Sequence, residues 1–203
     1  MSKRVRRGSR ALAATVGTAL VATLVLGGCS GGDDDPGAGP DDGASASTDP
    51  GEPPAVETQV SFGKVTGTLG RPARDRLSTD VRSVVDGWLD AAYVEGDYPR
   101  TDFADAWPGF TRGARAEAKR DADLMSNQDL GADIDGVEPV GRALRIDVLA
   151  VKRKPVGVTA HVILKFDTTG GTQERVKVAG RLYLTREGGG WQVFGYDVTK
   201  GAI

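Results

Sequence analysis

The hydrophobic positions of this chain follow a helical spacing first and an alternating spacing afterwards. Between about residues 74 and 94, apolar side chains recur every three or four positions, which predicts one long amphipathic helix ending before Gly96. A second helix is expected from Thr111, a residue type that caps helix N-termini, to about Met125, with an apolar stripe made mostly of alanine. After Gly131 apolar and polar residues alternate to the end of the sequence, which predicts β-strands.

Short turns rich in glycine and proline divide the alternating region into four strands. We expect these strands at about residues 143–151, 158–167, 175–184 and 191–198. The first turn is placed at Lys154 and Pro155, and a shorter strand near residues 60–65 would add an edge. Helices followed by an antiparallel meander form an α+β fold, in which the long helix covers one face of a curved sheet.

The first 28 residues have the three-zone pattern of a secretory signal peptide. Five basic residues and no acidic one occupy the first ten positions, and an uncharged run follows from Ala11 to Gly28. This run is short for a membrane span and rich in small residues, so a cleaved signal is favoured over an uncleaved transmembrane helix. It leads into Leu26-Gly27-Gly28-Cys29, which resembles the lipobox of bacterial lipoproteins. The resemblance implies that a diacylglyceryl group is attached to Cys29, which then becomes the new N-terminus.

Three regions are therefore expected: a signal peptide over 1–28, a lipidated cysteine with an acidic tether over 29–58, and one folded domain over 59–203. Residues 30–57 contain eight acidic residues and no basic one among Gly, Pro, Ser and Ala, which is typical of a disordered spacer rather than of a site for a divalent cation. Because each buried CH₂ contributes about 0.8 kcal/mol, a diacyl anchor would hold the protein at the extracytoplasmic side of the cell membrane.

The composition excludes several kinds of chemistry. Cys29 is the only cysteine and His161 the only histidine, so the domain has no disulfide, no thiol nucleophile and no multi-histidine or cysteine metal centre. We therefore expect no metal and no other cofactor. From Lys64 onward there are 21 basic and 20 acidic residues, a balance that argues against a nucleic-acid partner.

The order of elements and the closing Trp-x-Val-x-x-Tyr-Asp strand, which begins at Trp191, resemble the nuclear transport factor 2-like (cystatin-like) superfamily. More narrowly, residues 77–198 are similar to short exported actinobacterial proteins of that fold, including those associated with mammalian-cell-entry transport systems. The resemblance implies a cone between sheet and helix with an apolar pocket at its open end. Its walls would include Trp88, Tyr93, Trp107, Phe110, Phe194 and Tyr196, although aromatic rings at such positions more often fill an ordinary core.

Members that resemble ketosteroid isomerase use a carboxylate base in an apolar pocket with a hydroxyl donor, which directs attention to Asp197 with Tyr196 or Tyr93. Tyr196 and Asp197 are neighbours on one strand, so they point to opposite faces unless a bulge intervenes. His161 is expected on the solvent face without a positioned partner. The sequence thus predicts no catalytic residue, and an isomerase-like or dehydratase-like enzyme is the least favoured function.

The strand alternation also predicts a basic outer face of the sheet that includes His161 and Tyr183. Its five cationic side chains are Arg145, Lys165, Arg175, Lys177 and Arg181. Asp147 and Asp167 can pair with them, so the face is either a solvated surface or a docking site for an anionic envelope polymer, an acidic protein or a second copy of the chain. We expect an anchored, non-catalytic binding or scaffolding module at the cell envelope. A carrier or sensor of a small apolar ligand in the cone pocket is the alternative.

Overall fold

The computed structural model describes residues 56–203. The predicted signal peptide, Cys29 and most of the predicted tether lie outside the described residues. Within residues 56–203, no helix combines the length and the apolar character needed to cross a lipid bilayer.

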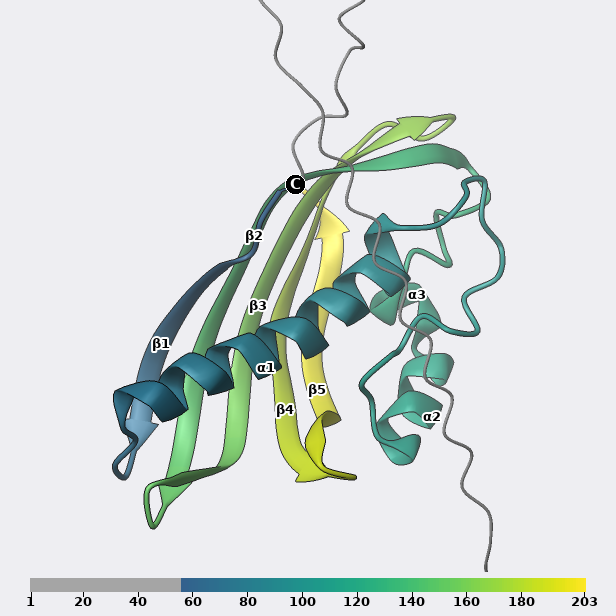
Figure 1. Ribbon diagram of the computed structural model, residues 1–203. Helices are drawn as coiled ribbons and strands as arrows, with labels where there is room; N and C mark the ends of the chain where they lie inside the picture. Colours follow the sequence, from purple (N-terminus) through teal and green to yellow (C-terminus); the bar gives the residue numbers. More distant parts are fainter. Residues whose placement is uncertain (1–55) are drawn as a thin grey trace, which may run out of the picture. The chain divides into compact units, whose positions relative to one another are not determined.

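A five-stranded sheet with strand order β1-β2-β3-β4-β5 forms the body of the domain (Figure 1). Its strands are β1 (Gln59–Thr66), β2 (Ile134–Val151), β3 (Lys154–Gly170), β4 (Arg175–Glu187) and β5 (Gly190–Ala202). Strands β2 to β5 form an antiparallel meander, whereas β1 pairs with β2 in parallel. The expected α+β class is present, but the sheet is mixed rather than purely antiparallel. The reason is that β1 reaches β2 through a long crossover containing the helices, which is the connection a parallel pair requires.

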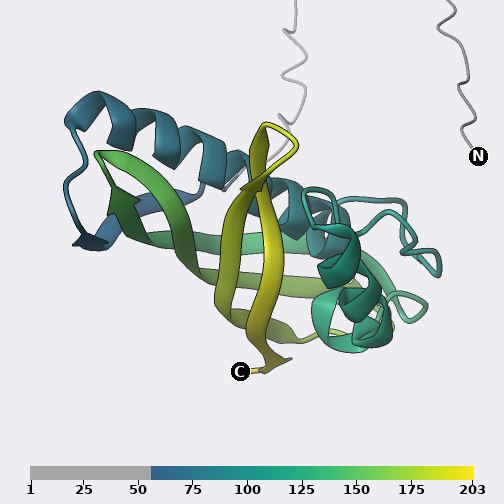
Figure 2. The ribbon, with the colours of Figure 1, turned by 90° about the horizontal axis from the view of Figure 1, so that it is seen from below.

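The helices occupy that crossover and lie on one side of the sheet. They are α1 (Arg71–Leu89), which continues into the π-helical turn η1 (Asp90–Val94), then α2 (Arg112–Arg120) and α3 (Ala122–Met125). Figure 1 shows α1 running diagonally across the strands, and the view from below in Figure 2 shows it on one side of the sheet only. The side chain of Thr111 accepts a hydrogen bond from the Ala114 N–H at 3.3 Å, so the predicted N-cap is confirmed. The expected second helix is interrupted at Asp121.

The face that meets α1 is called the inner face here, and its alternating apolar residues form the core. The three sets predicted from the alternation are all buried: Leu144, Ile146 and Val148; Val158, Ala160, Val162, Leu164 and Phe166; and Val176, Val178, Leu182 and Leu184. Against them pack the buried residues of α1, which include Leu77, Val81, Val85 and Trp88. Burying both sets removes a continuous apolar surface from water, and this burial is the main force that holds helix and sheet together.

Two boundaries differ from the sequence prediction. Strand β2 begins at Ile134, before the residues where alternation is clear. The β2–β3 turn lies at Lys152 and Arg153, which both have positive φ (49° and 64°), and not at Lys154 and Pro155. Non-glycine residues in this conformation are uncommon, so residue type alone did not indicate the turn.

Candidate functional site

Four of the six predicted pocket aromatics are part of the packed core. Trp88, Tyr93, Trp107 and Phe110 are at most 3% exposed. The Trp88 ring lies 5.6 Å from the Tyr93 ring and 6.0 Å from the Phe110 ring. The indole N–H groups of Trp88 and Trp107 both donate to the Met125 carbonyl, at 3.2 and 3.3 Å. The rings therefore fill the space between helices and sheet, and the buried indole donors of Trp88 and Trp107 are satisfied.

The other two predicted pocket residues, Phe194 and Tyr196, lie on opposite faces of β5. Tyr183 pairs with Gly195 and Leu184 pairs with Val193, so Phe194 is an extra residue in a β-bulge. The bulge turns Phe194 to the outer face, where it is 54% exposed and its ring centre lies 6.4 Å from that of Tyr183. The pocket wall that the resemblance implies is therefore wrong for Phe194, because the bulge leaves its side chain on the face opposite that of Tyr196.

Tyr196 and Asp197 point to opposite faces, as predicted from their adjacency. The Tyr196 hydroxyl donates to the carboxylate of Asp121 at 2.7 Å, and partial burial together with this neighbouring carboxylate raises the pKa of Tyr196. Asp197 is exposed on the outer face and forms an ion pair with Arg181. The two groups thus do not share a pocket in which one could act as base and the other as donor.

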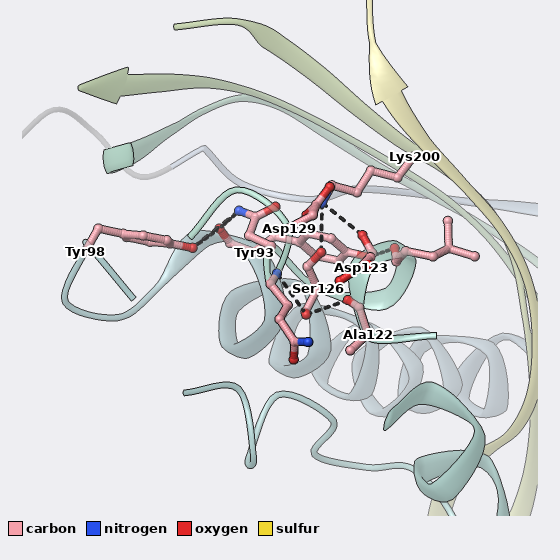
Figure 3. Close-up of polar contacts among 10 residues, drawn as sticks. Tyr93, Tyr98, Ala122, Asp123, Ser126, Asp129 and Lys200 are labelled. Atoms are coloured by element: carbon pink, nitrogen blue, oxygen red, sulfur yellow. Dashed lines mark hydrogen bonds and ion pairs between the residues drawn. The ribbon is translucent and has the colours of Figure 1, made fainter. Parts of the chain in front are cut away.

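A polar cluster that the sequence analysis missed joins β5 to α3. The Lys200 side chain is only 5% exposed, and its Nζ donates to the carbonyls of Asp123 (3.1 Å) and Ser126 (2.9 Å) and to the Asp129 carboxylate. Figure 3 shows the ammonium group directed at these oxygens from the β5 side. Desolvation lowers the pKa of Lys200, although the Asp129 carboxylate opposes this effect.

Tyr93 and Tyr98 extend the same cluster into the core. The Tyr93 hydroxyl donates to the Leu124 carbonyl at 2.7 Å, and the Tyr98 hydroxyl donates to the Tyr93 carbonyl at 2.9 Å. Burial raises the pKa of Tyr93 well above its ordinary value. Because these donors end on main-chain carbonyls, the cluster fixes α3 to η1 through Tyr93 and to β5 through Lys200, and it has the character of a structural clamp.

The outer face brings the five predicted cationic residues together in rows. Arg145 on β2, His161 on β3 and Arg181 on β4 are direct cross-strand neighbours. Lys165 lies opposite Lys177 in a second row. Arg175 lies opposite Asp167 in a third row. This regular grid follows from the unbroken two-residue period of β3 and β4 between these positions.

Two of these five charges, those of Arg175 and Arg181, are paired with carboxylates on neighbouring strands. Arg175 binds Asp167 through two hydrogen bonds, at 2.6 and 2.7 Å, and these bonds lower the pKa of Asp167 and raise that of Arg175. Among residues 56–203, by contrast, no carboxylate forms an ion pair with Arg145, Lys165 or Lys177. The face therefore combines internal ion pairs with residual positive charge.

His161 has a positioned partner, contrary to the sequence expectation. Its Nε2 lies 2.9 Å from the carboxylate of Asp147, which also accepts the Lys64 N–H at 2.8 Å. Desolvation raises the pKa of Asp147, but the bonds from Lys64 and His161 outweigh it and the net shift is downward. A side chain on Gly63 would overlap Asp147, so glycine at this bulge of β1 makes the approach possible.

An open groove of about 330 Å³ lies beside the Asp147–His161 pair. Phe194 and Tyr183 form one wall, Leu149 and Lys64 line the other side, and Gly157 and Thr159 of β3 lie between them. A Cβ built on Gly157 meets no atom within 4 Å, so the groove is open above this glycine. The groove could not be predicted from the sequence, because it depends on the bulge at Phe194.

The site holds a histidine and an orienting carboxylate, yet none of the hydrogen bonds formed by residues 56–203 joins His161 to a hydroxyl or amine nucleophile. Within the same residues, no group of three or more His, Cys, Asp or Glu side chains is arranged to hold a metal ion. A scan against protein-family models and searches of curated proteins and solved structures found no match to this chain. The geometry of the outer face therefore carries the functional argument.

Proposed function

We propose that this protein is a lipid-anchored, extracytoplasmic, non-catalytic module that binds a partner through the outer face of its sheet. The observation that carries the binding role is the aligned grid of cationic side chains on a face that no helix of residues 56–203 covers (Figure 2). Exposed charges in a regular array attract a partner of opposite charge and set its orientation. A scaffold of this kind needs no catalytic group.

The anchor is argued from the sequence. The Leu-Gly-Gly-Cys pattern at Cys29 follows an uncharged run and a basic N-terminal zone, which is the order that lipoprotein processing requires. The acidic residues 30–57 would then separate the membrane surface from the domain. Because like charges repel, an anionic bilayer would favour extension of this segment away from the surface.

For the fold family, we propose the nuclear transport factor 2-like group. Support comes from the long helix α1 placed before a meander of long strands and from the packing of that helix on one sheet face. Two observations favour binding over catalysis: no Asp or Glu side chain of residues 56–203 is buried, and four of the expected pocket aromatics are enclosed in the core. A general acid or base with a strongly raised pKa usually depends on such burial.

The anchor is tested by replacing Cys29 with alanine in the cell that makes the protein. We expect the wild-type chain in the membrane fraction, with a mass that fits cleavage before Cys29 plus a diacylglyceryl group, and the C29A chain without the lipid mass. A Ser30→Ala variant is the matched control and should retain the lipid. An unchanged mass and unchanged membrane partition in C29A would refute lipid anchoring.

The binding face is tested with immobilised poly-glutamate and poly-lysine surfaces. The full chain should bind poly-glutamate, with an affinity that falls as salt is added, and should not bind poly-lysine. The double variant Lys165→Glu, Lys177→Glu should lose this binding, whereas Lys119→Glu, Arg120→Glu on α2 should retain it. Equal binding by both double variants would show that the outer face is not the binding surface.

A further inference from the structure

We infer that the groove beside Asp147 and His161 receives an apolar side chain of an extended acidic polypeptide, whose carboxylates lie along the cationic rows of the outer face. This inference rests on the proposed function, because it names the chemistry of the partner that the same face would bind. The partner is a polypeptide segment with one apolar anchor and acidic residues at defined distances from it.

The groove is formed by β-bulges in the two edge strands of the sheet, β1 and β5. The β5 bulge places Phe194 beside Tyr183 on the outer face, and the β1 bulge places Lys64 beside Asp147. Phe194 is 54% exposed and Leu149 is 49% exposed, so two large apolar side chains face water across the groove. Bulges commonly re-aim side chains at functional sites, and an exposed apolar pair surrounded by polar residues is typical of a binding surface.

The size and openness of the groove favour an anchored side chain over a free small molecule. Small-molecule pockets span about 300–1,000 Å³ and enclose most of the ligand surface. This groove has about 330 Å³ and is open along the sheet. It can cover one large side chain, and the remaining affinity must then come from contacts outside the groove. Interfaces use aromatic anchors in shallow pockets in this way, with a polar rim around them.

The charges outside the groove define the spacing of the partner. On β4, the groove residue Tyr183 is followed along the outer face by Arg181 and, six residues from Tyr183, by Lys177. An extended chain advances about 6.6 Å for every two residues, so a partner strand lying along β4 keeps the same repeat. Acidic residues two and six positions from the apolar anchor would therefore lie opposite the row of Arg181 and the row of Lys177.

A second copy of the chain fits this face less well than an acidic segment. A face-to-face dimer would have a two-fold axis in the plane of the face, here taken near Ile163. If the axis runs along the strands, the row from Arg145 to Arg181 faces the same row of the second copy. If the axis runs across the strands, this row faces the row of Lys165 and Lys177. In both arrangements cations face cations, which opposes association. An acidic partner meets no such repulsion.

The test uses nine-residue peptides made of serine and threonine with one tryptophan and two glutamates. The set contains every placement of the two glutamates relative to the tryptophan. Binding of the full chain is measured by fluorescence anisotropy. We expect the tightest binding when the glutamates are two and six residues from the tryptophan on the same side. Replacing both glutamates by lysine should abolish binding.

Groove filling provides the matched variants. Gly157→Phe places a ring in the groove, whereas Gly113→Phe adds the same ring on α2, where a Cβ also meets no atom within 4 Å. We expect G157F to weaken binding of the best peptide at least about tenfold, and G113F to leave it unchanged. Thermal unfolding of both variants shows whether each retains the fold.

Four results would overturn the inference: no dependence on glutamate position, equal binding by G157F and wild type, equal binding of the lysine peptides, or a concentration-dependent dimer that excludes the peptide. If Lys165→Glu, Lys177→Glu removes binding to poly-glutamate while G157F binds the best tryptophan peptide as tightly as wild type does, the proposed function stands and the anchored groove is refuted. Loss of lipidation in C29A affects neither measurement, so failure of the anchor is separately visible.

Discussion

The inner and outer faces of the sheet differ in how fully the side chains on each face are held by contacts within the protein. On the inner face even a charged group is fixed, since the side chain of Lys200 is only 5% exposed and donates to three oxygens. On the outer face Lys165 and Lys177 stand side by side, and residues 56–203 offer neither of them an ion-pair partner. A buried ammonium group without acceptors would be too costly to keep, whereas exposed lysines remain available to a partner.

The glycines show the same contrast. A Cβ on Gly180, on the inner face of β4, would overlap the Asp197 carbonyl and the Val198 backbone. A Cβ on Gly141 or Gly157, on the outer face, meets no atom within 4 Å. Gly180 thus permits close packing on the inner face, whereas Gly141 and Gly157 leave open space on the outer face. Open space at these two positions is compatible with the partner-binding role proposed for the outer face.

The largest expected effect comes from truncating a core ring. Trp88→Ala should lower the free energy of unfolding by about 3–5 kcal/mol, because it leaves a cavity beside Tyr93 and Phe110. Phe194→Ala removes an exposed ring and should cost about 1 kcal/mol or less. Urea unfolding of both variants measures the difference. Similar losses in the two would mean that the groove wall is part of the folding core.

How well the fold could be predicted differs between the faces for a physical reason. Helix α1, the Thr111 cap and the buried alternation of β2, β3 and β4 follow from local spacing, which the sequence displays directly. The parallel pairing of β1 and the bulge at Phe194 depend on where a distant strand aligns. A shift of one residue there exchanges the faces of all the following side chains, and no local pattern reveals it.

The candidate site was predictable to the same extent. The five cations could be assigned to one face because no bulge lies between Arg175 and Arg181 or between His161 and Lys165. Sequence patterns did not predict three other features, which are the Asp147–His161 hydrogen bond, the groove and the contacts of Lys200. Each joins residues from different strands or from a strand and the helical crossover, and their distances are set by tertiary packing.

A smaller effect is expected from adding one methyl group to each face. Gly180→Ala should destabilise the domain by about 1–3 kcal/mol, since the β4 or β5 backbone must move to relieve the overlap. Gly141→Ala should change the free energy of unfolding by about 0.5 kcal/mol or less, because its Cβ enters open space. Thermal or urea unfolding provides the comparison. Equal effects would show that the β4–β5 pairing tolerates the shift and that the inner face is less rigid than its packing indicates.

The smallest effect concerns the acid dependence of the outer face. Two hydrogen bonds from Arg175 hold the pKa of Asp167 below its ordinary value in the folded protein. The unfolded chain therefore binds the proton more readily, so the pair contributes stability above the ordinary carboxyl pKa and loses it as the pH falls through the lowered one. Arg175→Leu should return the Asp167 pKa towards its ordinary value and flatten this part of the acid limb of stability, as measured by carboxyl-carbon NMR titration and unfolding at several pH values.

Lys177→Leu, which removes a neighbouring charge but none of these hydrogen bonds, should leave the Asp167 titration almost unchanged. Equal shifts of the Asp167 pKa in both variants would show that the general positive charge of the face controls this pKa, and not the two hydrogen bonds from Arg175. The ion pairs of the outer face would then be interchangeable.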